Sequence, residues 1–98
     1  MFDISTVSKR YFNIKLEDIL LDVEPPKLKA LKKITALAKS REEEAMDDLV
    51  EAVSMILNKN KTKYKISEEL IDELDFDQIN EILTAFFEWL TKSKNAPN

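Results

Sequence analysis

Five carboxylates in the middle of the chain are the strongest candidates for a catalytic or metal-binding site. They are Glu42, Glu43, Glu44, Asp47 and Asp48. Clustered carboxylates can bind a metal ion or serve as a general acid and base. The chain has no histidine and no cysteine, which removes the commonest general base and the usual transition-metal ligands. Because the start of a helix favours negative charge, we interpret this cluster as the first turns of a helix.

A second acidic stretch, DELDFDQINEIL at 72–83, superficially resembles a calcium-binding loop. It lacks a glycine at the sharp turn, and Ile79 stands where a ligand is needed. The chain has no glycine at all, so it also has no glycine-rich phosphate loop. The sequence therefore predicts no metal, no other cofactor and no enzymatic activity.

Lysines form two basic stretches, which raise nucleic-acid binding as an alternative function. The stretch 27–39 contains Lys27, Lys29, Lys32, Lys33 and Lys39, and the stretch 59–65 contains Lys59, Lys61, Lys63 and Lys65. The first stretch has no arginine or aromatic residue among its lysines to contact or stack on a base. The net charge is −4. We therefore expect no specific nucleic-acid partner, only weak and sequence-indifferent binding to DNA that falls steeply as salt rises.

Length and composition predict a single domain in the cytoplasm. The chain has 98 residues, 44% of them hydrophobic and 35% charged, which suits one core with a charged surface. No apolar run approaches the roughly 20 residues of a membrane span. The first ten residues lack the basic and apolar regions of a secretory signal. We expect no membrane partner.

Alternating apolar residues predict an N-terminal β-hairpin at 10–24, with strands at 11–16 and 19–24. Residues 1–9 are unpatterned and are expected to form a flexible arm. A lone hairpin is marginal in water, so it must be covered by helices or paired with another copy of the chain. We predict a homo-oligomer, with the subunit number left open. The self-association residues are expected to be Phe12, Ile14, Leu16, Ile19 and Leu21.

The remaining chain, 26–93, has a helical period, and 94–98 is expected to be a flexible tail. The predicted helices are 26–39, 41–58, 67–74 and 75–93, although 26–58 could also be one bent helix. Pro26 is expected to open the first helix, and Ser67 and Asp75 to cap the third and fourth. The predicted fold is thus α+β and mostly α-helical, a short hairpin followed by a small bundle of about four helices. The helix at 75–93 is expected to organise the others.

Large apolar residues cover a wide arc of that last helix. Phe86 and Leu90 lie on its apolar face, with Phe87 and Trp89 at opposite edges. One interpretation is that the whole arc packs into the core. The other is that part of it binds a partner helix, since half-exposed aromatic residues commonly dominate interfaces. The candidate partner-binding residues are Phe86, Phe87, Trp89 and Leu90.

The order of these segments resembles the small tail assembly chaperones of long-tailed phages and prophages of Gram-positive bacteria. The segments are RYFNIKLEDILLDVEPPKLKALKKITALAK, then ILNKNK at the end of the acidic helix, then ISEELIDELDFDQINEILTAFFEWL. The resemblance covers roughly residues 10–92. It implies a cytoplasmic, non-enzymatic protein of the bacterial host cell that binds the tape measure protein and keeps it soluble, with the tail tube protein as a further partner.

In that family a longer product is often made by ribosomal frameshifting, which an amino-acid sequence leaves open. The alternative function is a small phage or prophage regulator or adaptor that binds nucleic acid or a partner helix. The face that would bind the client is also left open by the sequence.

Overall fold

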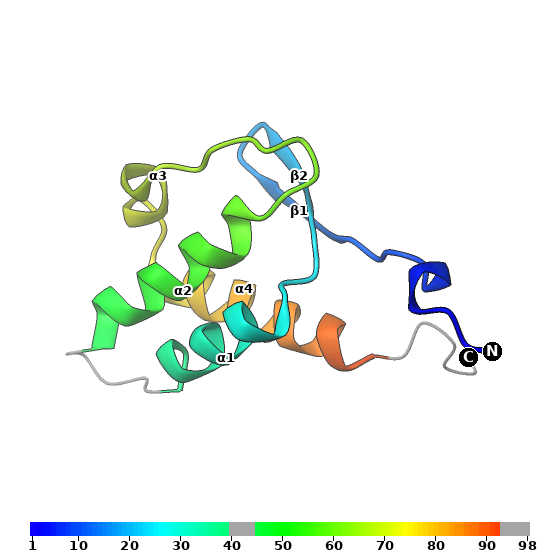
Figure 1. Cartoon of the computed structure of the whole chain (residues 1–98). Coiled ribbons are helices and arrows are strands. Elements are labelled where there is room, and N and C mark those ends of the chain that lie inside the picture. The colour runs from blue at the N-terminus through cyan, green and yellow to red at the C-terminus, as the bar shows by residue number, and fades with distance from the viewer. Residues whose placement is uncertain (40–44, 93–98) are drawn as a thin grey trace.

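The computed structural model describes residues 1–39 and 45–92, in which a β-hairpin precedes a group of helices (Figure 1). The strands are β1 (Phe12–Leu16) and β2 (Ile19–Val23). The helices are η1 (Ile4–Thr6), a single 3-10 turn, followed by α1 (Leu28–Leu37), α2 (Met46–Asn58), α3 (Glu68–Asp72) and α4 (Phe76–Thr91). The predicted α+β class and the order of hairpin and helices are confirmed.

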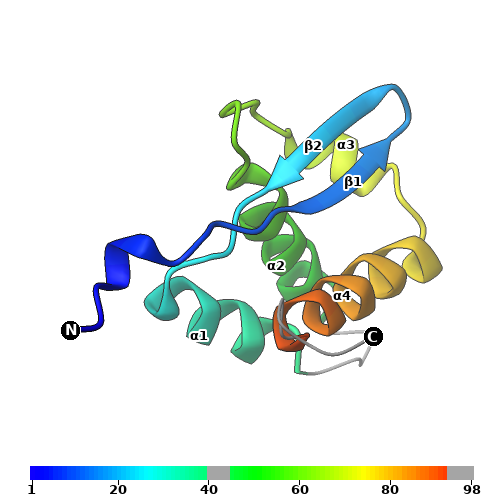
Figure 2. The same ribbon diagram turned by 90° about the vertical axis from the view of Figure 1, so that its right-hand side faces the viewer.

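Helix α2 lies at the centre of the molecule and contacts α1, α3, α4 and β2. Figures 1 and 2 show the hairpin on one side of α2, with α1 and α4 on the other. The sequence had suggested that α4 organises the other elements. In the structure, α2 has this role. The reason is that α2 buries five residues in one stripe, Leu49, Ala52, Val53, Ile56 and Leu57, one more than α4 buries.

The hairpin forms in the register that the alternation predicts. Phe12 pairs with Val23, and Leu16 pairs with Ile19 across a two-residue turn. Glu17 has a φ of 52° in this turn, which is the left-handed region that tight hairpin turns require. Because paired residues point to the same face of a sheet, the apolar residues of both strands share one face.

The helices begin and end within a few residues of their predicted bounds. Helix α1 begins at Leu28, two residues later than expected, because Lys27 still has an extended ψ of 157°. Pro26 is therefore not the first helical residue. Helices α1 and α2 are separate and pack against each other, so the alternative of one bent helix is wrong. The predicted start at residue 41 lies outside the described residues.

Side-chain caps define the starts of α3 and α4, as predicted. The Ser67 hydroxyl accepts a hydrogen bond from the Leu70 N–H at 3.2 Å. At α4, the Asp75 carboxylate accepts from the Gln78 N–H at 2.8 Å, and the Gln78 side chain accepts from the Asp75 N–H at 2.9 Å. This reciprocal capping box satisfies two N–H groups that the helix leaves unpaired. Helix α3 ends at Asp72, two residues earlier than predicted.

Two asparagine side chains hold the loop that follows α2. The Asn60 amide donates to the Tyr64 carbonyl at 2.7 Å and accepts from the Tyr64 N–H at 2.8 Å. Asn58 makes the same pair of bonds with Ile66, at 3.1 and 2.7 Å. Each amide thus replaces a backbone partner, and Asn60 is only 2% exposed. In this loop the left-handed φ belongs to Lys63, at 59°.

The start of the same loop covers part of the outer edge of β2. The Lys61 N–H donates to the Asp22 carbonyl at 2.9 Å, and the Glu24 N–H donates to the Lys59 carbonyl at 2.8 Å. Asn60 forms an isolated bridge with Val23 between them. The hairpin is therefore extended on one side by its own chain, which leaves β1 as the other edge.

Candidate functional site

The described carboxylates do not form a metal-binding cluster. Asp47 and Asp48 are exposed in the first turn of α2, while Glu42, Glu43 and Glu44 lie outside the described residues. Within residues 1–39 and 45–92, no three or more acidic side chains lie close enough to hold a metal ion. The stretch that resembles a calcium loop instead forms the end of α3 and the capped start of α4.

An aromatic cluster joins the hairpin to α4. The ring of Phe12 on β1 lies 5.9 Å from that of Phe86 and 5.8 Å from that of Trp89, between centroids. Phe87 lies 5.4 Å from Phe86 in an edge-to-face arrangement. Such geometries are the favourable ones for aromatic pairs. Phe86 is fully buried, so this cluster is part of the core that holds the hairpin against α4.

Arg10 closes the end of α4, where a helix without glycine needs a partner for its last carbonyls. Its guanidinium donates to the carbonyls of Trp89 and Lys92, each at 3.0 Å, and of Leu90 at 3.3 Å. It also lies 4.7 Å from the centroid of the Trp89 ring. A cation is favoured both at a helix C-terminus and over an aromatic face. The hydrogen-bonding groups of Arg10 are thus used within the chain, and Arg10 covers one face of the Trp89 ring.

The candidate partner-binding residues therefore divide into two groups. Phe86 is 0% exposed and cannot contact a partner without unfolding. Phe87, Trp89 and Leu90 are partly buried and pack against the core. No broad exposed apolar arc is left on the described part of α4, although the partial exposure of Phe87 is compatible with a contact at its rim.

The candidate self-association residues face the interior. Leu16 and Leu21 are buried, and Phe12, Ile14 and Ile19 pack against the core. Their side chains cover α2 and α4, so they are not a free surface for another copy. What the hairpin leaves available is the backbone edge of β1.

The structure reveals an apolar surface that the sequence pattern did not indicate, on the arm at residues 1–7. Phe2 and Ile4 are 76% and 72% exposed, and Met1 and Val7 are exposed as well. Figures 1 and 2 both show this segment leaving the body of the molecule. The longest extent of the molecule, with this segment included, is 48 Å. We name Met1, Phe2, Ile4 and Val7 the apolar arm.

Local hydrogen bonds shape the arm, and contacts with the body fix its base. Asp3 caps η1, accepting from the Ser5 hydroxyl at 2.7 Å and the Ser5 N–H at 3.0 Å. These bonds lower the pKa of the Asp3 carboxyl. At the base, Lys9 forms an ion pair with Glu24 at 3.5 Å, next to the Arg10 anchor. In the sequence, only the Asp3-Ile4-Ser5 pattern indicates this turn. So short a pattern occurs in many segments that do not form a turn.

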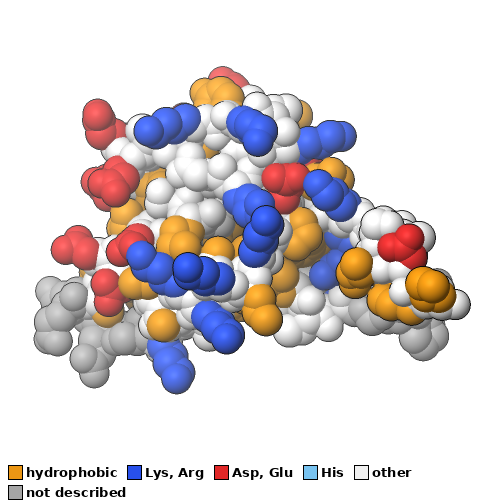
Figure 3. All heavy atoms as spheres, in the orientation of Figure 1, with side chains coloured by type: hydrophobic (Ala, Val, Ile, Leu, Met, Phe, Trp, Pro, Cys, Tyr) orange, Lys and Arg blue, Asp and Glu red, His pale blue; other side chains and the backbone are white. Residues whose placement is uncertain are grey.

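Lysines gather on one face of the molecule. Figure 3 shows Lys and Arg side chains over α1 and over the loop that follows α2. On α1, Lys33 forms an ion pair with Glu51 of α2 at 3.2 Å, which accounts for one of these charges. The two basic stretches of the sequence thus share a face, which the sequence alone did not indicate.

Within the described ranges, no helix combines the length and the apolar composition that a bilayer span requires. Comparisons of the chain with protein-family models, with curated proteins and with solved structures each gave no match. The class that the fold defines is a small α+β protein with a hairpin on a helical layer. The features that bear on function are therefore the exposed surfaces of the molecule and the order of segments in its sequence.

Proposed function

We propose that this chain is a non-enzymatic tail assembly chaperone of a long-tailed phage. In this proposal it binds the tape measure protein in the host cytoplasm and keeps it soluble until the tail tube forms around it. The observation that carries the proposal is the apolar arm, which exposes Met1, Phe2, Ile4 and Val7. Contiguous exposed apolar side chains are uncommon on small proteins and usually mark an interaction site.

The kind of client follows from the chemistry of the arm and from the family resemblance. A tape measure protein is long and helical, and before assembly its apolar stripes have no partner. Each large side chain that such a stripe buries contributes roughly 1.5 to 3 kcal/mol, so the few side chains of the arm supply a weak, reversible contact. Reversible binding suits a chaperone that must release its client, and the chemical inventory of the chain supports binding better than catalysis.

The proposal predicts that co-expression with the tape measure protein changes the solubility of that client. The candidate client is the product of the longest reading frame immediately downstream. We expect most of it to be insoluble when expressed alone and to be recovered in the soluble fraction, bound to this chain, when both are expressed. Equal solubility in the two cultures, with no co-purification, would refute the chaperone function.

Nucleic-acid binding is the second candidate, and the shared face of the two basic stretches favours it (Figure 3). If that face contacts phosphates, affinity for duplex DNA should appear at low salt and fall steeply as salt rises. We expect weak, sequence-indifferent binding of that kind in a titration followed by fluorescence anisotropy. A tight sequence-specific complex at physiological salt would favour a regulator over a chaperone.

A further inference from the structure

In the part of the chain that the structure describes, the outer edge of β1 has backbone hydrogen-bonding groups without a backbone partner. Residues that flank a two-residue hairpin turn form a hydrogen-bonded pair, and such pairs alternate along the strands. The N–H and C=O groups of Asn13 and Lys15 therefore point away from β2. On the other side of the hairpin, the equivalent groups of Asp22 and Glu24 bond to the loop after α2. Among the described residues, no backbone group bonds in this way to Asn13 or Lys15.

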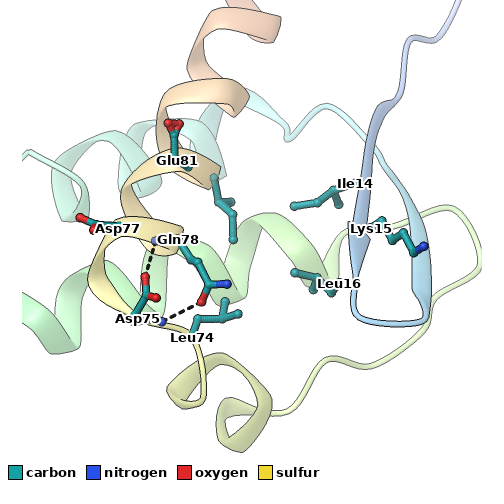
Figure 4. A pocket seen from close by; sticks show the side chains of 9 residues that line it. Ile14, Lys15, Leu16, Leu74, Asp75, Asp77, Gln78 and Glu81 are labelled. Carbon is teal, nitrogen blue, oxygen red and sulfur yellow. Dashed lines mark hydrogen bonds between the residues drawn. The ribbon is translucent and has the colours of Figure 1, made fainter.

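A groove lies directly beside this edge, between β1 and the first half of α4. Its cavity volume is about 350 Å³, enough for a few side chains. Figure 4 shows Ile14 and Leu16 pointing from the hairpin toward α4, while Lys15 points away. Leu74 and Ile82 complete its apolar lining from the α4 side. A strand placed beside β1 would therefore direct alternate side chains into this groove.

The lining of the groove from α4 is negatively charged. Asp75, Asp77 and Glu81 line it, and Lys15 is the one basic residue among the lining residues. Asp75 accepts the capping hydrogen bond of α4. Asp77 and Glu81 are exposed, and neither belongs to an ion pair among the described residues. The groove thus combines an apolar floor with two carboxylates that lack a basic partner within residues 1–39 and 45–92.

We propose that this groove binds an extended segment of another protein in which apolar and basic residues alternate at every second position, so that both kinds lie on the face toward α4. The segment adds a third strand to the hairpin by bonding to the backbone of Asn13 and Lys15. On that face, its apolar residues enter the groove and its basic residues pair with Asp77 and Glu81, while the residues between them point away from α4, as Lys15 does. This mode, in which a peptide extends an exposed sheet edge, takes affinity from the backbone and specificity from alternate side chains.

A second copy of the chain fits this groove less well. If two hairpins paired through β1, the α4 helices of both copies would flank the joined edge. Asp77 and Glu81 of one copy would then approach those of the other, and the chain already has a net charge of −4. Like charges brought together in this way oppose association. The charge of the groove favours a basic occupant.

The probe for this proposal is a short, labelled peptide with capped ends, Val-Thr-Lys-Thr-Val-Thr-Lys, in which valine and lysine share one face of the strand. We expect saturable binding by fluorescence anisotropy, and at least about tenfold weaker binding of the matching valine–glutamate peptide. In amide NMR spectra, the basic peptide should shift the Asn13 and Lys15 signals and slow their hydrogen exchange. Equal affinity for both peptides, or unchanged Asn13 and Lys15 signals, would overturn the proposal.

Two variants separate the charges of the groove from its strand edge. Asp77→Asn with Glu81→Gln should weaken binding of the basic peptide about tenfold, since each exposed pair contributes a few-fold. The control is Glu68→Gln with Asp72→Asn, which removes the same charge from α3 and should leave affinity unchanged. If both double variants weaken binding equally, only the overall charge matters and the groove is not the site.

Lys15→Pro removes the outward N–H at a strand edge, where proline is tolerated. It should weaken peptide binding while the circular dichroism spectrum stays unchanged. If the variant misfolds, the charge variants still decide the matter. A wild-type dimer in light scattering that Lys15→Pro dissociates would show that a second copy occupies the edge, and would overturn the proposal. This inference extends beyond the proposed chaperone function, and it can fail while client binding through the apolar arm survives.

Discussion

Phe86→Ala is expected to lower the free energy of unfolding by about 3 to 5 kcal/mol. Phe86 is 0% exposed, and its ring contacts those of Phe12, Phe87 and Trp89. Removing a buried aromatic ring costs about 3 to 5 kcal/mol, because apolar contacts are lost and a cavity remains. Small domains have about 5 to 15 kcal/mol of stability in total, so this loss is most of the lower value. Urea denaturation followed by circular dichroism measures it.

The matched control is Phe87→Ala, which removes the same side chain from the next position. Phe87 is only partly buried, so we expect a smaller loss of roughly 1 to 2 kcal/mol and a folded protein. If the two variants had equal free energies of unfolding, the assignment of Phe86 to the core and Phe87 to the rim would be wrong.

Asn60→Asp is expected to have an effect of similar size, from a change of one atom. The Asn60 amide donates to the carbonyls of Leu57 at 2.8 Å and Tyr64 at 2.7 Å. A carboxylate at the same position cannot donate, and it would place a buried negative charge against these two oxygens. An uncompensated buried charge costs about 3 to 5 kcal/mol. The loop after α2 should then detach from β2, because the same residue bridges to Val23.

The pH dependence of Asn60→Asp provides an independent check. The native fold favours the neutral form of the introduced carboxyl, so its pKa should rise above its value in the unfolded chain. The destabilisation should therefore be large at about pH 7 and smaller at about pH 4.5, where protonation restores one donor. Thr62→Ala, which removes one 3.3 Å hydrogen bond to Asn60, is the control and should cost well under 1 kcal/mol. A pH-independent loss would contradict this explanation.

The parts of the fold that were predicted correctly depend on neighbours in sequence. Alternation defined β1 and β2, and the spacing from Asp75 to Gln78 identified the start of α4. Contacts between distant segments could not be predicted in this way. Arg10 reaches the end of α4 across about eighty positions of chain, and nothing near it distinguishes it from a surface arginine. Likewise, nothing near Asn60 in the sequence distinguishes it from a surface asparagine, yet it is a buried side-chain partner of Tyr64.

The candidate site was harder to predict than the fold because burial depends on which elements cover a helix. The wide apolar arc of α4 suggested a free aromatic edge. In the structure Phe12 covers it from the hairpin, and Arg10 covers Trp89. Conversely, the arm was unpatterned, and only its position outside the body shows Phe2 and Ile4 to be exposed. The groove beside β1 likewise requires two distant segments to be placed together.

Co-purification of the tape measure protein with arm variants directly tests whether the apolar arm binds the client. The variant Phe2→Ser with Ile4→Ser removes apolar area from the arm, and the control Leu20→Ser with Leu28→Ser removes exposed apolar area elsewhere. Both variants should remain folded, because all four side chains are exposed. We predict that the control recovers as much soluble client as the wild type, while the arm variant loses most of it. Equal recovery by both variants would contradict the assignment of client binding to the apolar arm.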